Sequence, residues 1–153
     1  DGIISVYIGS DGSGKDLLKL PAGGSRLPAS HETIDKKLHF VQMQGNEVFK
    51  FAVKIMHDAA EKAVRKKGLG CKDIDLVIPH QANRRIMEAA MKKMGLPLAK
   101  LFSNIEKYGN MAAASTAVAL CEAVEENKIK KGDILVMVAF GAGLTWGSCV
   151  IKW

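Results

Sequence analysis

The sequence has 153 residues, of which 48% are hydrophobic, and its formal net charge is +6 at pH 7. This size and composition are typical of one globular domain, and no apolar run reaches the roughly 18–20 residues needed to span a bilayer, so we expect no membrane partner. The three cysteines, Cys71, Cys121 and Cys149, lie far apart without a CxxC pair. That spacing argues against a disulfide framework or a metal site and is typical of a reducing, cytoplasmic compartment.

Residues 1–30 predict a β-hairpin followed by a loop. Residues 3–8 alternate as a strand does, residues 16–20 form a second expected strand, and the Gly-rich residues 10–14 form the turn between them. Residues 21–30 are rich in Gly, Pro, Ser and Ala and predict a loop. Because the sequence opens inside a strand pattern, without an initiator methionine or a secretory leader, we expect it to be a piece of a longer polypeptide.

The next part of the chain alternates between helix and strand. Apolar residues recur at helical spacing over 46–68, and residues 75–79 form a short apolar run typical of a buried strand. A second amphipathic helix is predicted over 83–94, with Asn83 as its N-cap and Gly95 as its stop.

The C-terminal part repeats this alternation. Residues 101–105 are expected to be extended, residues 106–110 to form a turn, and residues 111–120 to form a helix of mostly small side chains. Small side chains let another backbone approach closely, so we expect this helix in the middle of a layered structure. Strands are predicted at 134–140 and 145–151. The whole pattern indicates an α/β fold with helices packed on a sheet.

Two polar residues, His80 and Asn110, lie at the predicted junctions that lead into helices. If both junctions face the same edge of the sheet, an imidazole nitrogen and a carboxamide can converge on one carbonyl oxygen and stabilise negative charge there. The nearby helix N-terminus disfavours a charged imidazole, so we expect a neutral His80 that donates through one nitrogen. The alternative is a purely structural histidine, which is the commoner role of a lone histidine before a helix.

Basic residues gather at 62–67, 84–85 and 92–93. Nucleic acid is one partner for such clusters, and an acidic protein or a phosphorylated cofactor is another. Solvated helix faces without any partner are the third interpretation.

Three motifs occur in one order: HQAN at residues 80–83, YGN at 108–110 before the Ala-rich helix, and FGAGLTWG at 140–147. Together they resemble the C-terminal half of the β-ketoacyl-acyl carrier protein synthase III family, which belongs to the thiolase-like condensing enzymes. The resemblance covers essentially all of residues 1–153, with residues 1–30 leading into the half. It implies a layered αβα half with a five-stranded mixed sheet and helices on both faces, one half of a five-layer αβαβα fold.

The resemblance implies an acyltransferase that starts fatty acid synthesis. Such an enzyme moves a short acyl group from coenzyme A to a cysteine and condenses it with malonyl-acyl carrier protein, releasing carbon dioxide. Acyl-CoA is then a substrate, and no cofactor is permanently bound. His80 and Asn110 match the residues that hold the malonyl thioester carbonyl and stabilise the enolate, and the backbone N–H of Ala142 matches an oxyanion donor. No cysteine here matches the family's nucleophile, which belongs to the N-terminal half.

The resemblance also implies binding surfaces and partners. The coenzyme A tunnel of the family matches Met43, Gly45, Asn46, Phe49, Ala82, Asn83 and Ile86. The carrier protein surface matches Arg85, with Lys50, Lys92 and Lys93 as neighbouring candidates. An acidic carrier protein, rather than nucleic acid, therefore becomes the expected partner, together with the missing N-terminal half and a homodimer in the full-length enzyme. The alternative function is a non-catalytic module that docks an acidic carrier protein.

Overall fold

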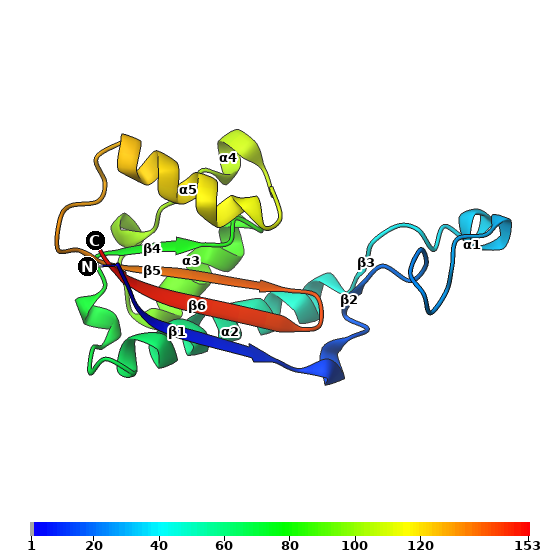
Figure 1. The fold of residues 1–153 in the computed structure, drawn as a ribbon, viewed down its shortest axis with the longest axis horizontal. Helices are drawn as coiled ribbons and strands as arrows, with labels where there is room; N and C mark the ends of the chain where they lie inside the picture. Colours follow the sequence, from blue (N-terminus) through cyan, green and yellow to red (C-terminus); the bar gives the residue numbers. More distant parts are fainter. Residues whose placement is uncertain (1) are drawn as a thin grey trace.

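The computed structural model describes residues 2–153 and contains a mixed sheet of four strands at its centre (Figure 1). The strands are β1 (Gly2–Ser10), β4 (Leu76–Pro79), β5 (Ile134–Gly141) and β6 (Thr145–Lys152), in the order β1-β6-β5-β4. β6 pairs antiparallel with both β1 and β5, whereas β4 pairs parallel with β5. The C-terminal end of β4 and the turn between β5 and β6 therefore lie at the same edge of the sheet.

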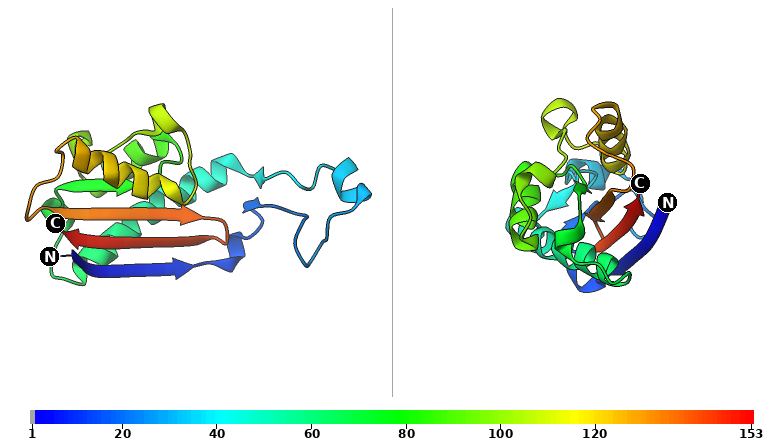
Figure 2. Two further views of the ribbon diagram at one scale, coloured as in Figure 1. Left: turned by 45° about the horizontal axis from the view of Figure 1, so that its top comes forward. Right: turned by 90° about the vertical axis from the view of Figure 1, so that its left-hand side faces the viewer.

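Helices cover both faces of this sheet (Figure 2). α2 (Gly45–Arg65) and α3 (Arg84–Met94) pack against each other, and their apolar sides share one core with β4, β5 and β6. α5 (Ala114–Glu125) packs against β4 and β5, and its buried alanines belong to the core of the opposite face. The predicted mixed sheet with helices on both faces is confirmed.

β4, like β5, is covered by helices on both faces of the sheet. All its residues are buried; Val77 packs into the α2 and α3 core, while Leu76 and Ile78 pack with Ala119 and Ala123 of α5. A strand that is covered on both faces has a continuous apolar run instead of an alternating pattern. This explains why residues 76–78 are all apolar and buried, with no outward polar side chain among them.

Local signals set the ends of α3 where we predicted them. The Asn83 side chain accepts a hydrogen bond from the Arg85 N–H at 2.9 Å, and so satisfies one of the free donors of the first turn. Gly95 ends the helix in the left-handed conformation with φ +70°. α2 begins and ends close to the predicted range 46–68, and a turn over residues 66–68 follows it.

The predicted N-terminal hairpin is wrong. β1 pairs along its length with β6, while β2 (Leu18–Lys19) pairs with β3 (Gln42–Met43). A 3-10 turn, η1 (Gly12–Gly14), separates β1 from β2, and Asp11 caps it by accepting from Ser13 N–H at 2.9 Å. This turn directs the chain away from β1, so β2 pairs with β3 and not with β1.

An arm extends from the sheet between β2 and β3 (Figure 1). It contains the predicted loop over residues 21–30, where one isolated bridge joins Gly24 to Leu27, and the short helix α1 (His31–Asp35). Ser30 and Thr33 cap this helix reciprocally, each accepting from the backbone N–H of the other.

Residues 98–110 differ from the expectation. η3 (Leu98–Lys100) precedes Leu101, which forms one parallel bridge to Val77, and Phe102 N–H donates to Val77 O at 3.0 Å. The predicted fifth strand is thus reduced to a single bridge beside β4. The predicted turn over 106–110 is mostly the helical turn α4 (Ile105–Tyr108).

Two surfaces of the fold are uncovered. Only one side of α5 is buried, at Ser115, Ala119, Glu122 and Ala123, so the expectation of a helix enclosed in a layered structure is wrong for residues 2–153. The small residues at its start, over 112–114, are exposed because no other part of residues 2–153 covers them. β1 is an edge strand, and its apolar side chains Ile3, Val6 and Ile8 are 67%, 49% and 75% exposed.

Candidate functional site

His80 is held at the carboxyl end of β4 by its own backbone. Its N–H donates to Val138 O at 2.7 Å, which extends the pairing with β5, and its carbonyl accepts from the Ala82 N–H at 2.9 Å. The ring lies edge-on to Phe140 with the two ring centroids 6.0 Å apart. These contacts fix a half-buried imidazole at the edge where the crevices of open α/β sheets bind ligands.

The pKa of His80 is lowered, and burial is the cause. Among residues 2–153, no hydrogen bond or neighbouring charge contributes to that shift. The expected neutral imidazole is thus favoured, although through desolvation instead of through the helix N-terminus. A neutral ring offers one N–H donor and one acceptor nitrogen.

A cavity of about 410 Å³ opens beside His80 and is lined by residues of the first and third sequence motifs and by residues that follow the second. The lining comes from the end of β5, the start of β6, and the residues just before and at the start of α5. The lining residues are His80, Ala112, Ala113, Thr116, Ala139, Phe140, Gly141, Thr145, Trp146 and Gly147. This volume lies within the range of small-molecule binding sites.

Asn110 lies next to this cavity and is exposed, but its side chain is outside the lining. Its Oδ1 accepts from the Ala112 N–H at 2.9 Å, which occupies the carbonyl end of the carboxamide. The amide hydrogens on Nδ2 are then the groups available for donation. Ala112 has φ +50°, an uncommon conformation for a residue with a side chain, and marks a tightly constrained loop.

Ala142 lies in the turn between β5 and β6 and is exposed, beside the lining residue Gly141. Its carbonyl accepts from Thr145 Oγ1 at 3.0 Å, which fixes the orientation of the turn. Gly143 has φ +140°, and a Cβ there would lie 2.6 Å from the Thr145 methyl carbon. Only glycine fits this position without strain, so Gly143 fixes the backbone conformation of the turn between β5 and β6.

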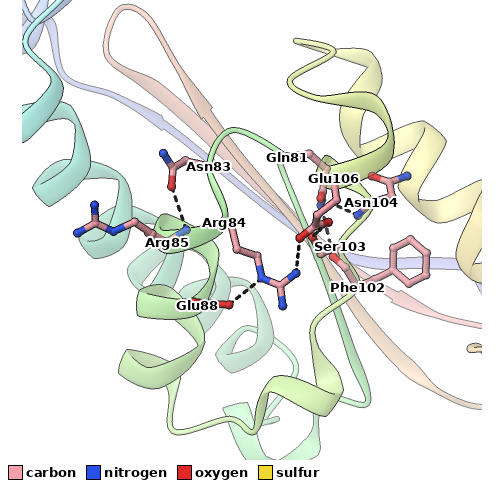
Figure 3. A network of polar contacts seen from close by, with 9 residues as sticks. All are labelled: Gln81, Asn83, Arg84, Arg85, Glu88, Phe102, Ser103, Asn104 and Glu106. Carbon is pink, nitrogen blue, oxygen red and sulfur yellow. Dashed lines mark hydrogen bonds and ion pairs between the residues drawn. The ribbon is translucent and has the colours of Figure 1, made fainter.

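Sequence reasoning missed Gln81, whose side chain is fully buried next to His80. Its Nε2 donates to Pro79 O at 2.9 Å. The Nε2 also donates to Phe102 O at 3.3 Å, and the Oε1 accepts from the Asn104 N–H at 3.1 Å (Figure 3). Gln81 thereby fixes the loop after β4 to the segment before α4. A glutamine in the middle of a motif after an apolar run was the available signal.

Sequence reasoning also missed Glu122, a nearly buried carboxylate on α5. It accepts from Lys107 Nζ at 2.5 Å, from the Tyr108 hydroxyl at 2.6 Å and from Asn104 Nδ2 at 2.7 Å. Lys107 contributes most to the shift, and these donors together lower the pKa of Glu122 to about 2. Glu122 therefore carries its charge throughout the physiological range and connects α5 to the segment that leads to Asn110.

The two arginines of the HQANRR segment have different roles. Arg84 forms ion pairs with Glu88, at 2.7 Å, and with Glu106 of α4, so its charge is neutralised. The Arg85 side chain points away from this pair on the other side of α3 and is exposed (Figure 3). Among residues 2–153, no carboxylate forms an ion pair with Arg85, which leaves its charge available to a partner.

A second hollow, of about 650 Å³, lies between α2 and α3 and contains two of the predicted carrier-protein residues. Its lining residues are Phe49, Arg85, Glu88, Ala89, Lys92, Leu96, Pro97 and Leu98. Lys93 is exposed outside this lining, and Lys50 is exposed and paired with Glu47 at 2.9 Å. Arg85, Lys92 and the apolar Phe49 thus share one concave surface, whose lining also contains Glu88.

The predicted coenzyme A residues occupy different environments. Met43, Gly45 and Asn46 are exposed at the start of α2, and Phe49 is half-buried in the second hollow. The remaining positions lie around the start of α3: a half-buried Ala82, an exposed Asn83 that caps the helix, and Ile86, which is buried in the core. Within residues 2–153 they do not line a single cavity.

None of the cysteines is activated as a nucleophile within residues 2–153. Burial raises the pKa of the Cys71 and Cys149 thiols, and the charge of Glu125 raises the pKa of Cys121. A nucleophilic cysteine needs the opposite shift, which a helix N-terminus or a nearby cation produces.

Metal-binding clusters and membrane-spanning helices are both absent from the residues that the structure describes. No group of three or more His, Cys, Asp or Glu side chains that could hold a metal ion occurs in residues 2–153. Across these residues, no helix has the length and apolar character needed to cross a membrane.

Comparisons with known proteins give consistent matches. The family model described as "3-Oxoacyl-[acyl-carrier-protein (ACP)] synthase III C terminal" matches residues 64–153. The β-ketoacyl-[acyl-carrier-protein] synthases III of Caldanaerobacter subterraneus subsp. tengcongensis and Clostridioides difficile are 57% and 56% identical, over 99% of this chain and 46% of theirs. The crystal structure of the synthase III from Thermus thermophilus has a TM-score of 0.86 and 42% identity, covering 99% of this chain and 46% of that one. This chain spans about half the length of these relatives.

Proposed function

Because the chain belongs to the 3-oxoacyl-[acyl-carrier-protein] synthase III family, we propose that it is the C-terminal half of a condensing enzyme of fatty acid synthesis. The reaction is the decarboxylative Claisen condensation of a short acyl group, taken from coenzyme A, with a malonyl group on an acyl carrier protein. Acyl-CoA serves as a substrate, and no permanently bound cofactor is required. From the resemblance to the synthase III family, we also expect a cytoplasmic location and a homodimer of the full-length enzyme.

The observation that carries the proposal is the position of His80 in one cavity with the segment after Asn110 and the turn after β5. The neutral imidazole and the Nδ2 amide of Asn110 donate to the thioester oxygen of the malonyl group. The bond between the malonyl α-carbon and its carboxylate breaks, and carbon dioxide leaves. The electron pair of that bond stays on the α-carbon and forms an enolate, whose oxygen the two donors stabilise. The enolate carbon then attacks the carbonyl of the enzyme-bound acyl thioester, and the cysteine thiolate leaves.

The nucleophilic cysteine comes from outside residues 1–153 in this proposal. Three observations support it: the raised thiol pKa values, the exposed position of Ala142 next to the lining residue Gly141, and the uncovered small residues over 112–114. An N-terminal half that places a cysteine near this helix would complete the site and cover its exposed side.

The hollow between α2 and α3 supports the carrier-protein part of the proposal. Arg85 and Lys92 present positive charge at its rim, and Phe49 provides an apolar base that a pantetheine arm can contact. An acidic carrier protein complements this surface, and long-range attraction raises its association rate. We expect Arg85→Glu to weaken binding of the carrier protein at least tenfold, whereas Lys67→Glu, an exposed charge reversal beyond the end of α2, serves as the matched control.

The decisive test is His80→Ala in the longest natural polypeptide that contains this chain. Loss of one preorganised donor typically lowers the rate by about 10²–10³-fold, so we expect decarboxylation of malonyl-acyl carrier protein to fall by that factor. His31→Ala, an exposed histidine in the arm, is the control. An unchanged decarboxylation rate for His80→Ala would contradict the assigned role.

The alternative function is a non-catalytic module that docks an acidic carrier protein, and the exposed charges of Arg85 and Lys92 favour it equally. The two functions differ in one measurement. A complete polypeptide that binds the carrier protein but releases no carbon dioxide from its malonyl form is the docking module and not the enzyme.

A further inference from the structure

A continuous path of hydrogen bonds connects the loop that carries His80 with the loop that carries Asn110. Gln81, directly after His80, accepts from the Asn104 N–H at 3.1 Å. The Asn104 side chain donates to Glu122 at 2.7 Å, and Glu122 accepts from the Tyr108 hydroxyl at 2.6 Å. The path crosses three separate segments of the chain and ends two residues before Asn110.

Burial makes the part of this path from Gln81 to Glu122 stiff, whereas Tyr108 at its end is 41% exposed. The Gln81 side chain is fully buried, and Asn104 and Glu122 are 6% and 9% exposed. The Gln81 amide donates to Pro79 O and Phe102 O, and its oxygen accepts from the Asn104 N–H. A change of rotamer would break these three hydrogen bonds. Hydrogen bonds in such surroundings are electrostatically stronger than in water, and breaking one leaves a costly unpaired group.

Glu122 is the centre where separate elements meet. Its carboxylate belongs to α5, whereas Lys107 and Tyr108 belong to α4 and Asn104 precedes α4. Gly109, with φ +67°, then turns the chain directly from Tyr108 into Asn110. The position of the Asn110 carboxamide therefore depends on where Glu122 holds Tyr108 and Lys107.

The helix α3 adds a second connection to the same segment. Arg84 pairs with Glu106 of α4, and Ser103 Oγ donates to Glu106 at 3.3 Å (Figure 3). This pair is exposed, so it contributes less than the buried path. Both connections nevertheless constrain the same distance, between the segment after β4 and the segment before α5.

We propose that Gln81 and Glu122 are positioning residues of the condensation reaction, which set the His80 and Asn110 donors at the separation that one enolate oxygen requires. This inference rests on the proposed function, because it assigns the path a role in the step that the two donors catalyse. Neither residue touches the substrate. Their effect is transmitted through the backbone of the two loops.

The test uses Glu122→Gln and Tyr108→Phe in the complete polypeptide, with Glu125→Gln as the control. Glu122→Gln keeps the shape but replaces an acceptor oxygen with a donor, and Tyr108→Phe removes only the hydroxyl. The Glu125 carboxylate is exposed on the same helix and, within residues 2–153, accepts only from the Cys121 thiol, at 3.6 Å, so its variant makes the same chemical change away from the path. Two steps are measured separately: acylation of the cysteine by acyl-CoA, and decarboxylation of malonyl-acyl carrier protein.

We expect the decarboxylation rate of Glu122→Gln and Tyr108→Phe to fall by roughly 10- to 100-fold, the range that a donor displaced by about 1 Å produces. Acylation by acyl-CoA, which does not use these donors, should stay within about twofold of the wild-type rate, as should both steps in Glu125→Gln. A selective loss of decarboxylation supports the inference, because a general loss of structure would lower both rates.

Two results would overturn it. Wild-type rates of both steps in Glu122→Gln and Tyr108→Phe, measured where His80→Ala lowers decarboxylation by the expected factor of about 10²–10³, would show that the path has no positioning role while the proposed function holds. An equal fall in both rates together with a lower melting temperature would show a purely structural role. Failure of the proposed function itself is recognised separately, since His80→Ala would then leave decarboxylation unchanged.

Discussion

Replacing Gln81 with methionine tests how much of the fold depends on one buried carboxamide. Methionine has similar length, and the side chain is fully buried, so the substitution leaves the volume nearly unchanged. It removes the acceptor of the Asn104 N–H and the donor to two carbonyls, Pro79 O at 2.9 Å and Phe102 O at 3.3 Å. The longest of these bonds contributes least.

Each buried polar group that loses its partner costs about 1–3 kcal/mol, and the gain from burying a more apolar side chain offsets part of that cost. We therefore expect Gln81→Met to lower the free energy of unfolding by about 2–5 kcal/mol. Urea unfolding followed by circular dichroism measures this, with a shift of the midpoint at constant slope as the sign of a native-state effect.

Gln44→Met is the matched control. Gln44 is exposed before α2, and its side chain forms no capping hydrogen bond, so its replacement should change the unfolding free energy by less than about 0.5 kcal/mol. A loss below about 1 kcal/mol for Gln81→Met would refute the reasoning, because the buried bonds would then contribute no more than exposed ones.

Three further outcomes are expected. Nuclear magnetic resonance titration should give His80 a pKa below its usual 6.5, so that it stays neutral until more acidic pH, and a value above 6.5 would contradict the burial argument. The lowered pKa of Glu122 stabilises the folded state at pH values above the ordinary pKa of 4.5, and this stabilisation is lost as pH falls toward about 2. Glu122→Gln should therefore reduce the change of melting temperature with pH over this range, and a curve parallel to that of wild type would disprove this. Gly9→Ala places a Cβ 2.6 Å from the Trp146 indole and should cost about 1–3 kcal/mol in thermal unfolding, whereas Gly12→Ala, with open space around it, should not; equal melting temperatures would show that the indole moves freely.

Elements with strong local signals could be predicted from the sequence. The apolar run before His80, the cap at Asn83 and the stop at Gly95 fix a strand, a loop and a helix within a residue or two. The pairing of β1 could not be predicted, because its partner β6 lies at the other end of the chain. A Gly-rich turn between two strand-like segments predicts a hairpin from the local pattern. The actual partner of β1 is determined only when the whole sheet is assembled.

The candidate site divides in the same way. His80 and Asn110 stand out in short motifs, and the structure places His80 and the residues after Asn110 at one cavity. Gln81 and Glu122 could not be predicted as partners, since their connection depends on Asn104, which lies far from both in the sequence. Helical periodicity alone describes Glu122 as one charged residue among alanines and gives no indication that three donors converge on it.

The uncovered edge of the sheet has a consequence for handling the chain. β1 has a row of backbone groups with no strand beside them in residues 2–153, and Ile3, Val6 and Ile8 project from it into solvent. Such an edge is a template for intermolecular strand addition, the first step toward cross-β aggregates. A lysine at Ile8 would act as a gatekeeper against self-association. Ile8 pairs with Gly147, which lines the His80 cavity, so this edge lies beside the candidate site. We expect stored samples to lose more protein to sedimentable aggregates at higher concentration.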